Sequence, residues 1–103
     1  MIARTWHGVT PAAKAEDYGD YLNRTGVVHC RETEGNRGVY VIRRIEGDKA
    51  HFLFISLWDS MDAIKRFAGS DTDRARYYPK DIEFLLELEP TVTHYEVAAA
   101  TID

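Results

Sequence analysis

The sequence contains a single cysteine, Cys30, and no Cys-x-x-Cys or Cys/His pattern surrounds it. This excludes an internal disulfide framework, and a lone thiol is typical of proteins that stay in a reducing compartment. The chain also lacks any apolar run close to the length that a membrane span requires, and its first residues do not form a secretion signal. We therefore expect a cytoplasmic protein without a membrane partner.

Positive charge is scarce as well, with 13 Lys and Arg against 17 Asp and Glu and a formal net charge of −4. Such a balance repels phosphate backbones, so a nucleic-acid partner is not expected. The sequence also lacks the glycine-rich nucleotide motifs, the GxSxG motif and the HExxH motif. The dinucleotide-binding, NTPase, serine-hydrolase and zincin classes therefore have no support.

The chain has enough apolar residues for one core and too little length for two. Its 103 residues match the commonest domain size, and 45% of them are hydrophobic. We therefore predict one domain over residues 1–103 that folds without disulfides or a structural metal.

Alternation and helical periodicity predict the elements of this domain. Strands are expected at residues 2–9, 38–45, 49–58 and 91–97. A first helix, capped by Thr10 with Pro11 in its first turn, should end near Gly26. Residues 27–36 have no clear period and should form a loop.

A second helix should follow the cap at Asp59-Ser60 and end at Gly69. Two shorter helical pieces are expected over residues 71–78 and 81–87. In the last piece the apolar side chains should point inward, namely Ile82, Leu85 and Leu86. The acidic side chains should point outward, namely Asp81, Glu83 and Glu87.

This order, β-α-β-β-α-β, is that of the ferredoxin-like split βαβ fold, an α+β class with an antiparallel sheet in spatial order 4-1-3-2. The third strand is apolar on both faces, with Phe52, Phe54 and Trp58 on one and Leu53, Ile55 and Leu57 on the other. The two helices of one monomer cover only one face, so the other face needs a second cover. The sequence thus predicts a homodimer that packs sheet against sheet.

Five segments spread over nearly the whole chain carry a family resemblance: Trp6-His7-Gly8-Val9-Thr10-Pro11, Gly35-Asn36-Arg37-Gly38, Leu57-Trp58-Asp59-Ser60 followed by Ala63-Ile64, Tyr77-Tyr78-Pro79, and His94-Tyr95-Glu96-Val97. Together they resemble the antibiotic-biosynthesis-monooxygenase group of the dimeric α+β barrel superfamily. The Trp-Asp-Ser start of the second helix, similar to a Trp-Glu-Ser segment common in that family, is the most specific piece.

The resemblance implies a homodimeric barrel with a pocket in each monomer between the sheet and its helices. Activities in this family include cofactor-independent oxygenation of polycyclic phenols or quinols and, in some branches, haem degradation. Haem-degrading members use an Asn on the first strand and a His on the second helix. The first strand here has no Asn and residues 65–69 have no His, so we expect no tightly bound cofactor.

Three histidines, His7, His51 and His94, are predicted to lie near one rim of the sheet, because the first strand runs antiparallel to both of its neighbours. If they share a face, they can form a metal site or an acid/base cluster. The register is not fixed by the sequence, however, and no carboxylate at ligand spacing accompanies them. Separate rim histidines without a metal are therefore the favoured interpretation.

Aromatic residues are the candidates for a substrate pocket. Trp6, Trp58 and Tyr77, with His94 beside them, suit a flat phenolic ligand because such pockets combine aromatic walls with a few polar tips. The same side chains can instead be ordinary core residues, and for any single one that role is the more common.

Oxygenation without a cofactor needs a base that generates an electron-rich phenolate and an enclosed site that protects the intermediate from water. The residue types make His7 or His51 the candidate catalytic base, with Arg4 or Arg44 holding the anion.

Two functions stay open on these residues. The first is a cofactor-independent monooxygenase-like enzyme that acts on a small aromatic phenol or quinol. The alternative is a non-catalytic dimer that binds a small apolar ligand. A pocket that holds a buried polar group with a perturbed pKa would favour the enzyme.

Overall fold

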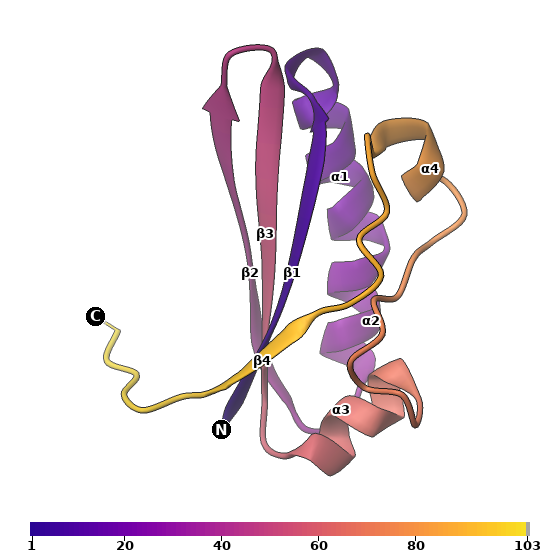
Figure 1. Ribbon diagram of the computed structural model, residues 1–103. Helices are drawn as coiled ribbons and strands as arrows, with labels where there is room; N and C mark the ends of the chain where they lie inside the picture. Colours follow the sequence, from indigo (N-terminus) through magenta and orange to yellow (C-terminus); the bar gives the residue numbers. More distant parts are fainter. Residues whose placement is uncertain (103) are drawn as a thin grey trace.

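A computed structural model describes residues 1–102 and shows a four-stranded antiparallel sheet whose helices all lie on one face (Figure 1). The strands are β1 (Ile2–Pro11), β2 (Asn36–Glu46), β3 (Lys49–Trp58) and β4 (Thr93–Glu96), in spatial order β2-β3-β1-β4. This is the predicted order of the split βαβ fold, and it places the most apolar strand, β3, in the interior of the sheet.

The helical layer consists of a 3-10 turn (Ala12–Lys14) and the helices α1 (Ala15–Arg24), α2 (Gly26–Glu32), α3 (Met61–Ala68) and α4 (Asp81–Phe84). Helices α1 and α2 follow each other in one column along the sheet (Figure 1). None of the helices within residues 1–102 is long and apolar enough to cross a membrane.

The loop predicted over residues 27–36 is wrong, because most of that stretch is α2. Gly26 begins this helix and does not end the previous one in a left-handed conformation. A Cβ at this position would lie 3.1 Å from the ring of Phe54, so the missing side chain lets the start of α2 approach the sheet closely. Cys30 then points inward and is fully buried.

The predicted start of the first helix also needs correction. Strand β1 continues through Thr10, which pairs with Ala50, and through Pro11, which pairs with Lys49. The Thr10 hydroxyl donates to the carbonyl of Pro11 at 3.0 Å and caps nothing. The start of α3 is as predicted, since the Ser60 hydroxyl accepts from the Ala63 N–H at 3.2 Å.

The segment after α3 differs most from its prediction. Residues 71–78 are not helical; Arg74 forms a β-bridge with Thr91, and the Val92 N–H donates to the carbonyl of Asp73 at 2.8 Å. Because residues 91–92 pair with this segment, β4 begins only at Thr93.

The predicted orientation of the last helical piece is also wrong in part. Helix α4 is a single turn in which Asp81 is buried, while Ile82 is 71% exposed. Leu86 lies beyond the helix and is exposed as well, and only Leu85 packs inward as predicted.

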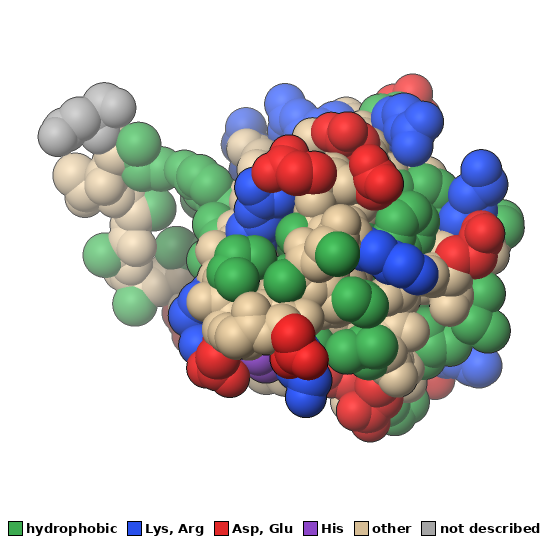
Figure 2. Space-filling model, turned by 90° about the horizontal axis from the view of Figure 1, so that it is seen from above, with side chains coloured by type: hydrophobic (Ala, Val, Ile, Leu, Met, Phe, Trp, Pro, Cys, Tyr) green, Lys and Arg blue, Asp and Glu red, His purple; other side chains and the backbone are tan. Residues whose placement is uncertain are grey.

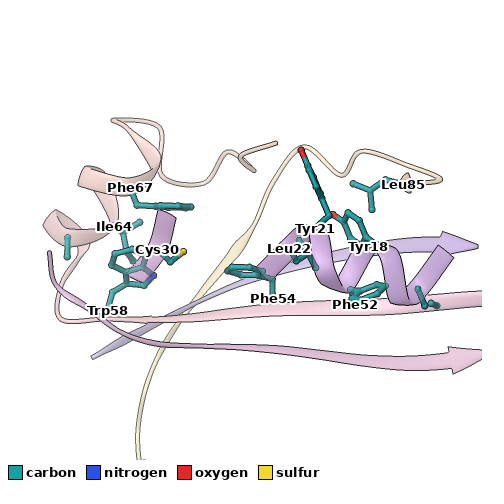
Figure 3. Close-up of a cluster of buried hydrophobic side chains, with 13 residues drawn as sticks. Tyr18, Tyr21, Leu22, Cys30, Phe52, Phe54, Trp58, Ile64, Phe67 and Leu85 are labelled. Carbon is teal, nitrogen blue, oxygen red and sulfur yellow. The ribbon is translucent and has the colours of Figure 1, made fainter. Parts of the chain in front are cut away.

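The core lies between the sheet and the helices (Figure 3). From β3 it receives Phe52 and Trp58, both essentially inaccessible, and Trp58 packs against Phe67 of α3 with ring centroids 5.6 Å apart. On the opposite face of β3, Leu53 is 40% exposed. The predicted alternation is therefore confirmed, and one apolar phase of β3 faces away from the helices.

The surface mixes charges of both signs in the view from above (Figure 2). The chain beyond β4 leaves the body of the molecule, and residues 98–102 are exposed (Figures 1 and 2).

Candidate functional site

A cavity of about 50 Å³ lies between the helix-covered face of the sheet and the segment that precedes α4. Six aromatic side chains from β1, β3, α1, α3 and that segment line it: Trp6, Phe54, Tyr18, Phe67, Tyr77 and Tyr78. Four polar side chains also line it, namely Arg4, Ser56, Arg76 and Asp81. This volume holds a few water molecules, so a flat aromatic ligand requires the wall side chains to move.

Arg4 forms a buried cationic end of this cavity. Its side chain is only 4% exposed and donates through Nη2 to the carbonyl of Arg74 at 2.9 Å and through Nη1 to that of Thr72. The guanidinium lies over the ring of Phe67, 5.9 Å from its centroid, and Arg76 stacks on the same ring at 5.7 Å. Burial lowers the pKa of Arg4, but a guanidinium stays charged at neutral pH.

His94 borders this end from β4, where it pairs with Arg4 across the sheet. Its Nε2 lies 3.2 Å from Arg4 Nη1, and its Nδ1 lies 3.4 Å from an oxygen of Asp73. Because a guanidinium can only donate, His94 Nε2 accepts and the ring proton sits on Nδ1, facing the carboxylate. Burial and the charge of Arg4 lower the pKa of His94, which favours this neutral form.

Asp81 and Tyr18 form the opposite, acidic end. The Tyr18 hydroxyl donates to Asp81 Oδ1 at 2.9 Å, and the Tyr78 N–H donates to Oδ2 at 2.5 Å. Burial raises the pKa of Asp81, although both hydrogen bonds favour its ionised form. Burial and the neighbouring Asp81 also raise the pKa of Tyr18 well above its usual range, so Tyr18 stays a donor.

Trp6 and Tyr77 lie between the two ends. The Trp6 indole donates to the Tyr77 hydroxyl at 3.1 Å, and that hydroxyl donates to the carbonyl of Glu89 at 2.6 Å. Their rings meet edge to face at 6.1 Å. Both residues were predicted to bind substrate from the sequence, and both line the cavity.

The other predicted site residues lie elsewhere. Trp58 is fully buried in the core and does not line the cavity; its indole donates to Ser56 Oγ at 2.8 Å and so orients that cavity residue. His94 reaches the cavity only through Arg4. Arg4, considered as an anion holder together with Arg44, is in the cavity, whereas Arg44 pairs with Glu46 away from it.

His7 and His51 lie together on the face of the sheet opposite the cavity. His7 Nδ1 is 2.5 Å from an oxygen of Glu89, and His7 Nε2 is 3.2 Å from His51 Nδ1. The rings stack with centroids 5.5 Å apart. His51 Nε2 is buried without a hydrogen-bond partner in the described structure, since the Glu46 carboxylate at 3.7 Å is too far to accept from it.

Two of the three rim histidines therefore meet, and His94 lies on the other face because its register pairs it with Arg4. Within residues 1–102 no group of three or more His, Cys, Asp or Glu side chains is arranged to hold a metal ion. The role of His7 or His51 as a base stays a prediction, and it would act outside the cavity.

Sequence reasoning missed Asp81 as a cavity residue. Asp81 was assigned to an outward face from helical periodicity, and the only local signal against this was its place in the first turn of a very short helix after Pro79. Burial raises the pKa of the Cys30 thiol to about 12, which disfavours the thiolate that a nucleophilic cysteine needs.

No family model matches the sequence, and no curated protein matches it significantly. Solved structures do match. A Bacillus cereus protein assigned as an antibiotic biosynthesis monooxygenase is similar at a TM-score of 0.69 with 12% identity, covering 99% of this chain and 97% of its own. The heme-degrader MhuD from Mycobacterium tuberculosis, solved with two hemes in its active site, has a TM-score of 0.65 and 14% identity over 98% and 99% of the two chains.

A third structure, that of Rv0793 from Mycobacterium tuberculosis, has a TM-score of 0.60 and 15% identity, covering 99% of this chain and 100% of its own. At such identities the likeness shows the fold. The fold predicted from the sequence is thus confirmed, and so is the resemblance to the antibiotic-biosynthesis-monooxygenase group at the level of the fold.

The described residues do not fit a haem group. Strand β1 has no Asn and α3 has no His, the two positions that haem-degrading members use.

Proposed function

We propose that this protein is a cofactor-independent monooxygenase-like enzyme that oxidises a small aromatic phenol or quinol in the cavity. The supporting observation is a buried carboxylate, Asp81, at the end of an aromatic-walled cavity. Burial raises the pKa of this carboxyl, which makes its ionised form a stronger base than an exposed aspartate. A titratable group perturbed in this way inside a cavity is typical of catalytic sites.

In the proposed reaction Asp81 takes the phenolic proton, and dioxygen is the second substrate. The resulting phenolate carbon para to the oxygen forms a C–O bond with dioxygen and loses its own proton. The O–O bond then breaks, which releases water and leaves a quinone carbonyl. One molecule of 1-naphthol and one of dioxygen would thus give one 1,4-naphthoquinone and one water.

The aromatic walls have a separate task in this scheme. Trp6 on β1 and Phe54 on β3 are paired positions, so both project from the same face of the sheet, and both line the cavity. A ligand packed against these rings is shielded from water, which protects an electron-rich intermediate from side reactions. Tyr18, held as a donor, fixes the Asp81 carboxylate in position.

The protein is further proposed to be a homodimer that buries the open face of the sheet. Large apolar side chains lie exposed there: Tyr40 and Ile42 at 47%, Leu53 at 40% and Tyr95 at 57%. Ile42 pairs directly with Leu53, and Tyr40 with Ile55, so the surface is contiguous. Soluble monomers rarely expose such a patch. A cytoplasmic location stays a prediction, with which the free and buried Cys30 agrees.

The alternative function, a non-catalytic dimer that binds a small apolar ligand, is favoured by one observation. Both oxygens of Asp81 already accept hydrogen bonds from protein groups, which leaves fewer lone pairs for a substrate proton. In that case an aromatic ligand would bind without consuming oxygen.

Oxygen uptake with 1-naphthol, followed beside naphthol binding, tests these proposals. The enzyme predicts uptake with quinone formation, and Asp81→Asn should lower the rate by about a hundredfold or more while naphthol still binds. His7→Ala and His51→Ala are the matched variants on the opposite face and should keep the rate. Loss of turnover in those two variants alone would assign the base to the histidines, and binding without uptake in the wild type would favour the alternative.

A further inference from the structure

The cavity has a cationic end at Arg4 and an acidic end at Asp81. This difference in charge bears on which ligands the cavity binds. Arg4 is paired with Ser56 of the neighbouring strand, whereas Gly8 is paired with Phe52. Tyr18 packs on Phe52 and donates to Asp81, so the acidic end lies near the position of Gly8 along β1. These positions are four residues apart along β1, which corresponds to ~13 Å. Between them stand the aromatic side chains of Trp6 and Phe54.

The charge of Arg4 is not neutralised by any ion pair within residues 1–102. Its three hydrogen bonds to protein groups go to two carbonyls and a neutral imidazole and use only Nη1 and Nη2. Nε has no partner in the described structure, so part of the planar donor fork of the guanidinium is left over. A buried cation is costly when it lacks a counter-charge, and a carboxylate bound side-on to such a fork supplies one.

The neighbourhood of Arg4 reinforces this preference. Arg76 brings a second guanidinium to the same ring of Phe67. The Asp73 carboxylate is largely exposed and attracts the Arg4 guanidinium, but its ion pair is formed with His94 and not with Arg4. The cationic end therefore attracts anions, while the carboxylate at the Asp81 end repels them and accepts from a hydroxyl.

We propose that the cavity selects aromatic acids, with the ligand carboxylate bound by Arg4 and a hydroxyl at the far end of the ring system facing Asp81. This inference rests on the proposed aromatic site and names its substrate class, a hydroxylated aromatic carboxylate. Arg4 is then a specificity-determining residue that touches the ligand away from the reacting carbon.

Calorimetric titration of the wild-type protein with a matched pair of probes tests this assignment. The probes are 6-hydroxy-2-naphthoate and its neutral amide, 6-hydroxy-2-naphthamide, which share ring system and hydroxyl. The carboxylate should bind at least about tenfold more tightly than the amide, since one charge-assisted contact is enough for this ratio. Equal affinities, or tighter binding of the amide, would overturn the inference and leave the aromatic site intact.

Variants then locate the preference. Arg4→Gln should bind both probes with the affinity that the wild type shows for the amide, whereas Arg44→Gln on the open face should keep the wild-type ratio. A preference that survives in folded Arg4→Gln contradicts the role of Arg4. If that variant does not fold, the wild-type ratio still decides whether the cavity selects the anion. Failure of both probes to bind the wild type at millimolar concentration would overturn the inference and the proposed aromatic site together.

Discussion

The two faces of the sheet carry similar apolar side chains along β3 but differ in how their polar groups are satisfied. On the helix-covered face, the buried polar groups of Arg4, Ser56 and Asp81 have partners from distant segments. On the open face, large apolar side chains are exposed and His51 Nε2 is buried without a partner in the described structure. The first face thus has the properties of a ligand site whose polar groups are held in place, and the second those of a surface that a partner could cover.

The largest effect expected on the covered face comes from removing its central side chain. Trp58 is inaccessible, packs on Phe67 and orients Ser56. Trp58→Ala should lower the free energy of unfolding by about 3–5 kcal/mol, as for other large core residues. Urea unfolding followed by circular dichroism measures this. Ile82→Ala, exposed on α4, is the control and should change it by less than about 0.5 kcal/mol.

A substitution on the open face should change the formation of the dimer more than the folding of the monomer. Leu53→Lys places an ammonium group at the centre of the exposed apolar surface, where a partner sheet would have to desolvate it. The dimer should weaken by about a hundredfold or more while the helical content stays unchanged. Sedimentation velocity across a dilution series reports the mass. A wild-type protein that stays monomeric at high concentration would remove the proposed difference between the faces.

A smaller effect concerns the pH dependence of the covered face. Burial raises the pKa of Asp81 in the folded protein above its ordinary value of 3.8. At pH values between 3.8 and this raised pKa, the folded protein therefore binds more protons than the unfolded chain. The free energy of unfolding therefore loses a contribution as pH rises through this window. Asp81→Asn cannot titrate and should lack that loss, so its stability relative to the wild type should increase from pH of about 4 toward neutrality. Parallel curves from urea unfolding at several pH values would contradict the assigned shift.

Local patterns predicted the parts of the fold that depend on neighbours in sequence. The alternation in β3 and the Ser60 cap need only residues within one element, and both are confirmed. Gly26 was misinterpreted because its role depends on the ring of Phe54, 28 positions away. The residue type alone does not distinguish a glycine that allows close packing from one that ends a helix.

The site was less predictable for the same reason. Asp81 faces inward because Tyr18, 63 positions earlier, donates to it, and no periodicity within one helical turn encodes that contact. His94 was separated from His7 by the strand register, which the sequence does not fix. Of the three aromatic residues proposed for the pocket, Trp6 and Tyr77 line the cavity, whereas Trp58 lies in the core.

The most direct test of this division between the two faces is an amide NMR titration with 1-naphthol under argon, which prevents turnover. We predict that the largest shifts occur at the Trp6 indole N–H and at the backbone amides of Phe54 and Phe67, with His51 and Leu53 unchanged. Shifts concentrated at His51 and Leu53, with the Trp6 indole unaffected, would place ligand binding on the open face and contradict the assignment of the cavity.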